Sequence, residues 1–420
     1  KCQAMYSFLP SNSMTEQLTK NAGMFRSLKS FNARIFFAGI FVSHTGTWLQ
    51  HTATSYLLYE LSNNATTLGI NTAILFLPML IFGAWSGSLA DQVNRRITTL
   101  ITQLLMSVQA LVLGGLVLTD HINIPLIFLM SGFLGFLNAI DNPARRGLVT
   151  ELVPKEDLSN AISLNTAVMF TARVFGPALG AMLIVPLGVG VLFLINGLSF
   201  LGILVGLLHL RKNEMNTPEP RAKGGTPVRD GLRFVQSNNS LLNVMIVFTI
   251  VSTFAFNYTV SLPKLADFAW GDQKLFGWVL AAMSIGSIFG ALFTARLKSA
   301  SYRWFAWNVV LVGIGNIGIA WSPNVWFAYF WALPLGFGGS AILAGCNAIM
   351  QGESPTDMRS RLLSLTAIAA LGSTPIGGPI TGWIADAISV QWSLGYGGII
   401  SVLSGIYMIN WIWRSGVDRK

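Results

Sequence analysis

The sequence predicts an all-α membrane protein of twelve transmembrane helices in two pseudo-symmetric six-helix bundles, and three observations predict it. Only 10% of the 420 residues are charged and the mean hydropathy is +0.58, whereas soluble domains carry about 25% charged residues. Apolar stretches of roughly 20 residues, long enough to cross a bilayer, recur along the whole chain. Features of the first half also return in the second half at a nearly constant distance.

The apolar stretches define the expected membrane-spanning helices. Polar, Gly-rich or Pro-rich segments separate each stretch from the next. In chain order the expected spans are 34–59, 67–90, 97–119, 123–142, 158–184, 187–210, 240–263, 275–296, 304–321, 324–350, 361–385 and 391–413.

The basic residues predict the orientation of these spans. With a cytoplasmic N-terminus and alternating loops, 24 of the 27 Lys and Arg residues fall on the cytoplasmic side. Lys264 and Lys274 fall outside, and Arg173 lies inside a span. This positive-inside distribution predicts a multi-pass protein of the cell membrane, as in a bacterial inner membrane, with both termini cytoplasmic. Topology therefore accounts for the net charge of +10, and we expect the lipid bilayer as partner and no nucleic acid.

Three pairs of matching residues carry the internal repeat. They are Gly87 and Gly290, Pro154 and Pro355, and Pro177 and Pro379, which are 203, 201 and 202 residues apart. Two equivalent halves are the plan of secondary transporters, which bind a small molecule between the halves. We expect a cytoplasmic tail (1–33), a six-helix bundle (34–210), a cytoplasmic linker (211–239), a second bundle (240–413) and a cytoplasmic tail (414–420).

The residues that an enzyme would need are missing from the sequence. Cys2 and Cys346 are the only cysteines, and the four histidines show no metal-ligand spacing. The segment "GIGNIG" (313–318) matches GxGxxG but lies inside an expected span with no strand before it. We therefore expect no enzyme activity, no cofactor, no metal site and, without a GxxxxGK[ST] motif, no ATP-driven transport.

The loop "GSLADQVNRR" (87–96) after the second span allows two interpretations. One is ordinary helix capping together with inside-positive charge. The other is a conformational latch, in which the Asp91 carboxylate meets the partial positive charge at the start of the eleventh span. That contact exists only while the cytoplasmic ends of the halves are together, so it would bias a two-state equilibrium. The latch residues are Gly87, Asp91, Arg95 and Arg96.

This loop resembles the signature G-x-L-A-D-R-x-G-R-R of the major facilitator superfamily, with Gln92 in place of the usual basic residue and Asn94 in place of the usual glycine. The stretches 46–69 and 136–165 and the segment "ARVFGPALGAML" are similar to the branch that contains enterobactin-type exporters and drug:proton antiporters. The resemblance implies the major facilitator fold, alternating access and proton-coupled export of small molecules.

The segment "TARVFGPALGAML" (171–183) places a charge inside the fifth span. Arg173 lies about 22 Å along a helix that starts at Leu158, near the middle of the bilayer. A charge at that depth costs roughly 2.5–3.5 kcal/mol, so it should face protein or water. Arg173 is then either a structural residue bound to neighbouring carbonyls or a gate or substrate contact.

The same segment contains a stripe of small residues. Ala172, Gly176 and Gly180 allow close approach of another helix, and Pro177 permits a bend. "GPALG" resembles the antiporter motif, which implies that the fifth helix packs against the eighth, and the eleventh against the second. The gating motif then comprises Arg173, Gly176, Pro177, Gly180, Gly378, Pro379 and Gly382.

Few residues are suited to proton coupling, which itself follows only from the resemblance. Asp141 in "AIDNPARR" is the best-placed carboxylate, but it could equally anchor a loop by pairing with Arg145 or Arg146. His51 is the second candidate because histidine is the side chain that ordinarily titrates near neutral pH, but a histidine bonded within a helix interface is the alternative.

The resemblance also implies that the first, fourth, seventh and tenth helices line the substrate cavity. Aromatic rings with a few amides suit an amphipathic or aromatic ligand, although aromatic residues also face lipid. Arg173 favours an anionic group on that ligand, such as a catecholate or carboxylate. The candidate cavity residues are Trp48, Gln50, Asn138, Asn257, Tyr258, Trp331 and Asn347.

The sequence thus predicts a secondary transporter that exports small amphipathic molecules, drug-like or siderophore-like, with protons as the coupled ion. An importer or uniporter of a nutrient is the alternative within the same class. A receptor or assembly factor on a transporter fold is the alternative from a different class. We infer no obligate protein partner.

Overall fold

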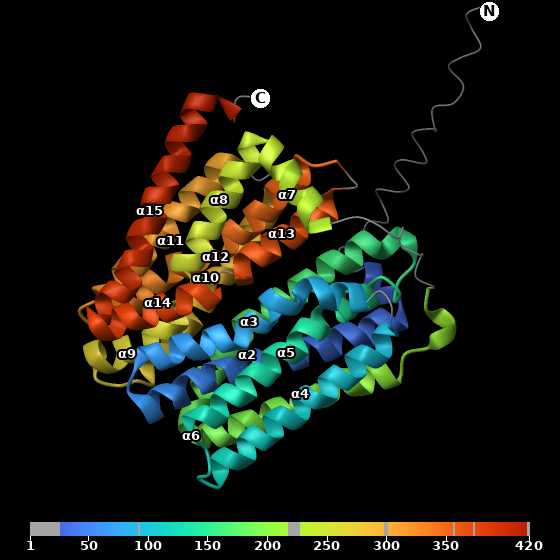
Figure 1. Cartoon of the computed structure of the whole chain (residues 1–420), viewed down its shortest axis with the longest axis horizontal. Helices are drawn as coiled ribbons and strands as arrows, with labels where there is room; N and C mark the ends of the chain where they lie inside the picture. Colours follow the sequence, from blue (N-terminus) through green and yellow to red (C-terminus); the bar gives the residue numbers. More distant parts are fainter. Residues whose placement is uncertain are drawn as a thin grey trace, which may run out of the picture.

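The computed structural model describes residues 26–90, 93–216, 227–297, 301–355, 358–372 and 374–417. Within these ranges the secondary structure is helical, without strands (Figure 1). The first half contains η1 (Arg26–Lys29), α2 (Phe31–Ser62), α3 (Ala65–Ala90), α4 (Arg95–Leu118), α5 (Ile124–Val149), η2 (Lys155–Asp157) and α6 (Leu158–Leu208). The rest contains η3 (Lys212–Glu214), α7 (Pro227–Ser237), α8 (Asn239–Phe254), α9 (Tyr258–Trp270), α10 (Leu275–Arg296), α11 (Tyr302–Ala320), α12 (Val325–Gly352), α13 (Arg359–Gly372), α14 (Thr374–Ala387) and α15 (Val390–Ser415).

Short polar residues fix where many of these helices begin. A side-chain oxygen just before the helix accepts a hydrogen bond from a free N–H group of the first turn, which stabilises a helix by about 1 kcal/mol. This holds for α2, α4, α5, α11, α12 and α15, whose caps are Ser30, Asn94, Asn123, Ser301, Asn324 and Ser389. The helix starts therefore fall within a few residues of the predicted spans.

α6 contains the fifth and sixth spans, which reverse direction at Gly188. Gly188 has φ 75° and ψ 162°, a conformation that only glycine adopts readily. Along the first arm of α6 the residue numbers of the contacted positions in α2 increase, from Thr45 at Gly176 to Thr52 at Gly180. Along the second arm they decrease, from Val42 at Gly202 to Ile35 at Gly206. The two arms of α6 are therefore antiparallel.

The seventh span differs from its prediction in extent and shape. It was expected at 240–263, but it continues to Trp270 and is interrupted between α8 and α9. At the interruption the Asn257 side chain donates a hydrogen bond to the Thr253 carbonyl at 2.5 Å. Such side-chain bonds compete with helical backbone bonds, which hydropathy does not reveal.

Ten segments of the described residues are long and apolar enough to cross a membrane. α2 is not among them because polar residues such as Gln50 and His51 lower its hydropathy, and residues 160–208 of α6 are counted once. With α2 and both arms of α6 included, the helices follow the order of the twelve expected spans. The segment expected as a linker contains the helix α7, which packs on α13.

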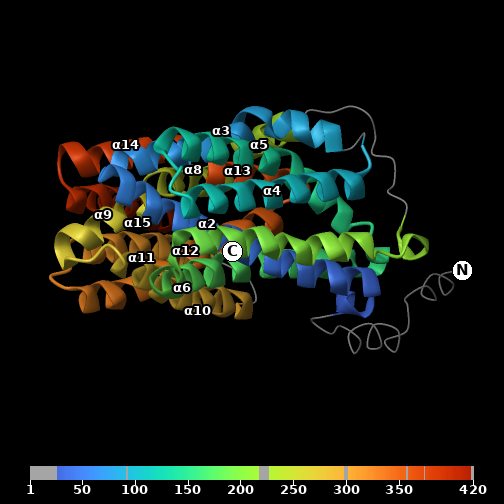
Figure 2. The same cartoon turned by 90° about the horizontal axis from the view of Figure 1, so that it is seen from below.

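The two halves meet at one end of the molecule. Contacts between them come from α3 with α14, α9 and α13, from α6 with α10, and from α2 with α9. Figure 1 shows the ribbons of the halves meeting near α3, α9 and α14 and diverging away from them, and Figure 2 gives the view turned by 90°. We call this the joined end; it carries the turns at 63–64, 271–274 and 388–389.

Candidate functional site

Arg173 lies over an aromatic ring of a neighbouring helix. Its guanidinium carbon is 4.9 Å from the centroid of the Trp48 ring of α2. The His51 ring packs edge-to-face on Trp48, with 5.2 Å between the ring centroids. Among the described residues, no carbonyl or carboxylate forms a hydrogen bond or ion pair with Arg173. The contact of Arg173 that the structure describes is thus with an aromatic ring.

The glycines of the fifth span face α2 rather than the helix that the antiporter motif implied. A Cβ on Gly176 would meet Trp48, and one on Gly180 would lie 3.2 Å from the Thr52 Cβ. Contact with the eighth span, α10, is made one residue later, where a Cβ on Gly277 would lie 2.5 Å from that of Ala181. The expected contact between the fifth and eighth spans is thus present, but the stripe of small residues in the fifth span packs against α2. Spacing shows which residues share a face, not which neighbour covers it.

The corresponding glycines of the eleventh span pack as expected, against the second span. A Cβ on Gly378 would lie 3.1 Å from the Gly69 carbonyl oxygen, and one on Gly69 would lie 3.0 Å from Pro379. A Cβ on Gly382 would lie 2.5 Å from the Ala65 carbonyl oxygen. These residues bring the backbones of α14 and α3 into direct contact across the two halves.

Asp386 at the end of α14 binds the first turn of α3 in the other half. Its carboxylate accepts hydrogen bonds from the backbone N–H groups of Ala65 at 3.0 Å and Thr66 at 2.7 Å. The Thr66 hydroxyl donates a further bond at 2.6 Å, and Lys264 of α9 forms an ion pair at 2.5 Å. A carboxylate at this place also complements the positive end of the helix dipole.

Two further hydrogen bonds cross the halves at the joined end. The Tyr59 hydroxyl donates to the Asp267 carboxylate at 3.0 Å, and the Gln273 amide donates to the Tyr56 carbonyl at 2.9 Å. The Tyr56 ring also stacks on Phe276. No sequence motif marked these residues as part of a site. The one available signal was that Lys264 and Lys274 are the only basic residues expected on that side.

The predicted latch after α3 is only partly described. Asp91 lies outside the described residues, and Gly87 lies in the last turns of α3. Arg95 forms an ion pair with Glu151 at 2.9 Å, and burial raises the pKa of that carboxyl while the Arg95 hydrogen bond opposes the increase. The Arg96 guanidinium donates to the carbonyls of Leu207 and Leu208. These partners of Arg95 and Arg96 lie in the first half.

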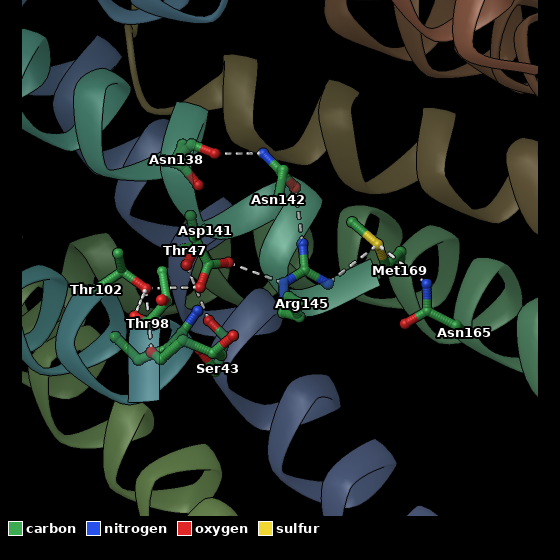
Figure 3. A network of polar contacts seen from close by, with 12 residues as sticks. Ser43, Thr47, Thr98, Thr102, Asn138, Asp141, Asn142, Arg145, Asn165 and Met169 are labelled. Carbon is green, nitrogen blue, oxygen red and sulfur yellow. Dashed lines mark hydrogen bonds and ion pairs between the residues drawn. The ribbon is translucent and has the colours of Figure 1, made fainter. Parts of the chain in front are cut away.

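Asp141 belongs to a buried polar network of the first half (Figure 3). It pairs with Arg145 one turn later at 2.9 Å, and both side chains are 1% exposed. The Thr102 hydroxyl donates to the other carboxylate oxygen at 2.9 Å, and Arg145 also donates to the Asn142 amide oxygen at 2.8 Å. The Asn142 amide in turn binds the Asn138 carbonyl at 2.9 Å. The structure thus contains the ion pair of Asp141 with Arg145, which was one of the two expected alternatives.

The other cavity candidates do not form one cluster. Gln50 is 2% exposed and lies inside the first bundle, where its amide bonds Gln109 and Asn196. Asn257 is buried against Gly377, and Trp331 packs on Gly318.

Two candidates remain near the surface of their bundle. Tyr258 is half-buried at the start of α9. Asn347 is half-buried as well, and its amide oxygen accepts a hydrogen bond from Thr366 at 2.8 Å. Among the described residues, no three His, Cys, Asp or Glu side chains are grouped as metal ligands.

Comparison with known proteins places this arrangement among transporters. A family model described as transmembrane secretion effector matches residues 23–416. The staphyloferrin A transporter of Staphylococcus aureus is 21% identical over 90% of this chain and 96% of its own length. The multidrug efflux pump Tap of Mycolicibacterium fortuitum is 25% identical, with coverages of 85% and 90%. The enterobactin exporter EntS of Escherichia coli is 21% identical, with coverages of 90% and 90%.

Solved structures confirm the predicted fold class. A bacterial homologue of the lysosomal transporter Spinster, in an inward-facing and unoccupied conformation, aligns with a TM-score of 0.68 at 14% identity, covering 90% of this chain and 95% of that chain. The nucleoside transporter NupG aligns with a TM-score of 0.71 at 12% identity, covering 90% and 99%.

Proposed function

Because the chain belongs to the transmembrane secretion effector family of the major facilitator superfamily, we propose that it exports small amphipathic molecules, drug-like or siderophore-like, by proton-coupled alternating access. The chain is a multi-pass membrane transporter and not an enzyme. The finer assignment draws on relatives that are named as siderophore transporters and a multidrug pump.

One observation carries the alternating-access part of the proposal: side chains of both halves bind each other at the joined end. Alternating access requires contacts that form in one state and break in the other. The positive-inside rule assigns the joined end to the outside and the loops after α3 and α5 to the cytoplasm. In this assignment the described state faces inward, in a bacterial inner membrane with both termini cytoplasmic. The halves are residues 34–210 and 240–413, joined by the linker 211–239.

Asp91 supplies the opposing contact in this proposal. It follows α3 directly in the sequence, and α13 begins at Arg359 on the same side of the molecule. When the cytoplasmic ends come together, the Asp91 carboxylate meets the positive end of α13. Asp386 then releases α3 at the other end.

Asp141 is the proposed coupling carboxylate, and protons are the proposed coupled ion. Its negative charge neutralises Arg145 in a fully buried pair. Protonation of Asp141 leaves a buried cation without its partner, which is costly unless the surrounding helices rearrange. Proton binding and helix arrangement are thereby linked. His51 is the second candidate, since it lies beside Trp48 and Arg173.

Flux in proteoliposomes tests the proposal. We would load a lipophilic cationic dye or, separately, a catecholate siderophore, impose a pH gradient and compare flux with empty liposomes. Gradient-dependent export of either compound is the expected result. Downhill uptake of a nutrient without proton movement would favour the importer or uniporter. Folded protein without any flux would favour a receptor or assembly factor.

A further inference from the structure

Three hydrogen-bond donors gather between α2 and α6 without a protein acceptor. They are the Arg173 guanidinium, the Trp48 indole N–H and the His51 ring, all on half-buried side chains. In the described part of the chain, none of the three forms a hydrogen bond. A half-buried guanidinium within an expected membrane span normally pairs with a carboxylate, a phosphate or carbonyl oxygens. The cluster therefore lacks an acceptor.

The cluster lies on the side of α6 that turns toward the second half. At about 100° per residue, Arg173 lies roughly 60° around the helix from Gly176, in the direction of Ala181. Gly176 faces α2, and Ala181 touches Gly277 of α10 in the second half. Arg173 is thus between the α2 contact and the α10 contact. Phe175, which is 45% exposed, points the other way.

Depth excludes a lipid headgroup as the missing acceptor. Trp48 lies about 25 Å from the start of α2 and about 20 Å from its end. Phosphate groups of lipids lie outside the hydrocarbon core, which is roughly 30 Å thick. A small molecule that enters between the halves can supply an acceptor at that depth.

The chemistry of the cluster selects an aromatic carboxylate. A guanidinium offers two parallel N–H groups that match the two oxygens of a carboxylate, and its flat face stacks on aromatic rings. One arginine balances one negative charge, which favours a monoanion over a phosphate dianion. Trp48 and His51 add ring surface beside the charge.

We propose that Arg173, Trp48 and His51 form a binding subsite for the carboxylate of a small planar aromatic anion. This inference rests on the proposed export function, since it names the class of substrate that the exporter takes. Arg173 binds the carboxylate, and Trp48 holds the guanidinium in place and contacts the ring.

Binding of salicylate to the purified full chain in detergent tests the subsite, with salicylamide as the uncharged analogue. By isothermal titration calorimetry, we expect wild-type protein to bind salicylate at least about tenfold more tightly than salicylamide. Arg173→Gln should lose that preference, and Arg173→Lys should retain part of it because it keeps the charge. Arg414→Gln, at an exposed position at the end of α15, is the matched control and should bind like wild type.

Two results would overturn the inference: equal binding of both probes to wild-type protein, or an unchanged salicylate preference in Arg173→Gln. Should Arg173→Gln fail to fold, Trp48→Leu provides the decision, since it leaves the charge in place. We expect it to weaken salicylate binding about threefold or more, by loss of the cation–π contact, and unchanged binding would refute the subsite. Dye export without salicylate binding would refute the subsite alone, whereas salicylate binding without any flux would refute the export function alone.

Discussion

At the scale of single residues, Asp386 links the two halves. It accepts two backbone and two side-chain donors, and these donors come from α3 and α9. We expect Asp386→Asn to weaken the joined end by about 1.5–3 kcal/mol, because a charged acceptor is lost. Spin labels at Leu61→Cys and Ile388→Cys, two exposed positions at this end, report the separation of the halves. In Asp386→Asn, the population with the longer label-to-label distance should increase about tenfold or more relative to the population with the shorter distance.

The matched control for this variant is Asp272→Asn. Asp272 is exposed at the same end, and its carboxylate accepts a hydrogen bond from the backbone N–H of Lys274 in its own half at 2.8 Å. We expect its distance distribution to equal that of wild type. An unchanged distribution in Asp386→Asn would show that its contacts do not hold the halves together.

The Asp141–Arg145 pair gives a prediction about stability. Removing one partner of a fully buried ion pair costs about 3–5 kcal/mol, because a charge stays buried alone. Asp141→Asn should therefore lower the unfolding temperature strongly. The double variant Asp141→Leu/Arg145→Met should have an unfolding temperature closer to that of wild type, because it leaves no buried charge at this place. Thermal unfolding in detergent measures both, and equal destabilisation of the two would contradict the argument.

Single residues also show what the sequence could and could not reveal. The depth of Arg173 followed from counting residues along an apolar helix. Its contact with Trp48, which is 125 positions away in the chain, depends on tertiary packing. Asp386 was visible only as an acidic residue near a helix end, because its partners Ala65 and Thr66 lie in the other half.

At the scale of helices, the contact of α3 with α14 depends on glycine. We expect Gly382→Ala to push the two helices apart, because its Cβ would lie 2.5 Å from the Ala65 carbonyl oxygen and 2.7 Å from the Thr66 Cα. The same pair of spin labels should show a longer distance. Gly115→Ala in α4 is the control, since a Cβ there has no atom within 4 Å. A wild-type distance in Gly382→Ala would mean that the close approach is dispensable.

Helix number and order were predictable because the bilayer imposes a length and a hydropathy on every span. The break between α8 and α9 was not, since it depends on one asparagine side chain that bonds a backbone carbonyl. The prediction of which helix packs on the glycine stripe in α6 was wrong for a similar reason. A stripe predicts close packing without naming the neighbour.

At the scale of the whole molecule, the proposal requires that the two ends close in turn. Asp386 binds the start of α3 at one end, and Asp91 is the proposed partner of α13 at the other. Asp91→Asn should therefore shift the population toward the state with the joined end closed, opposite to Asp386→Asn. Spin labels at Glu156→Cys and Gln351→Cys, two exposed positions at the opposite end, report the separation of the halves there. In Asp91→Asn their distance should increase while the distance between the labels at positions 61 and 388 decreases. Parallel changes at both ends would contradict alternating access.

The bond between Asp386 and α3 also places a natural reporter in the backbone. The amide protons of Ala65 and Thr66 bind a carboxylate that belongs to the other half of the chain. The next amide, that of Thr67, binds Asn64 in its own half at 3.3 Å. Deuterium should therefore enter the first two amides whenever the halves part, while the third stays protected. Three consecutive peptide groups would thus record the transport cycle by mass spectrometry in an unlabelled protein.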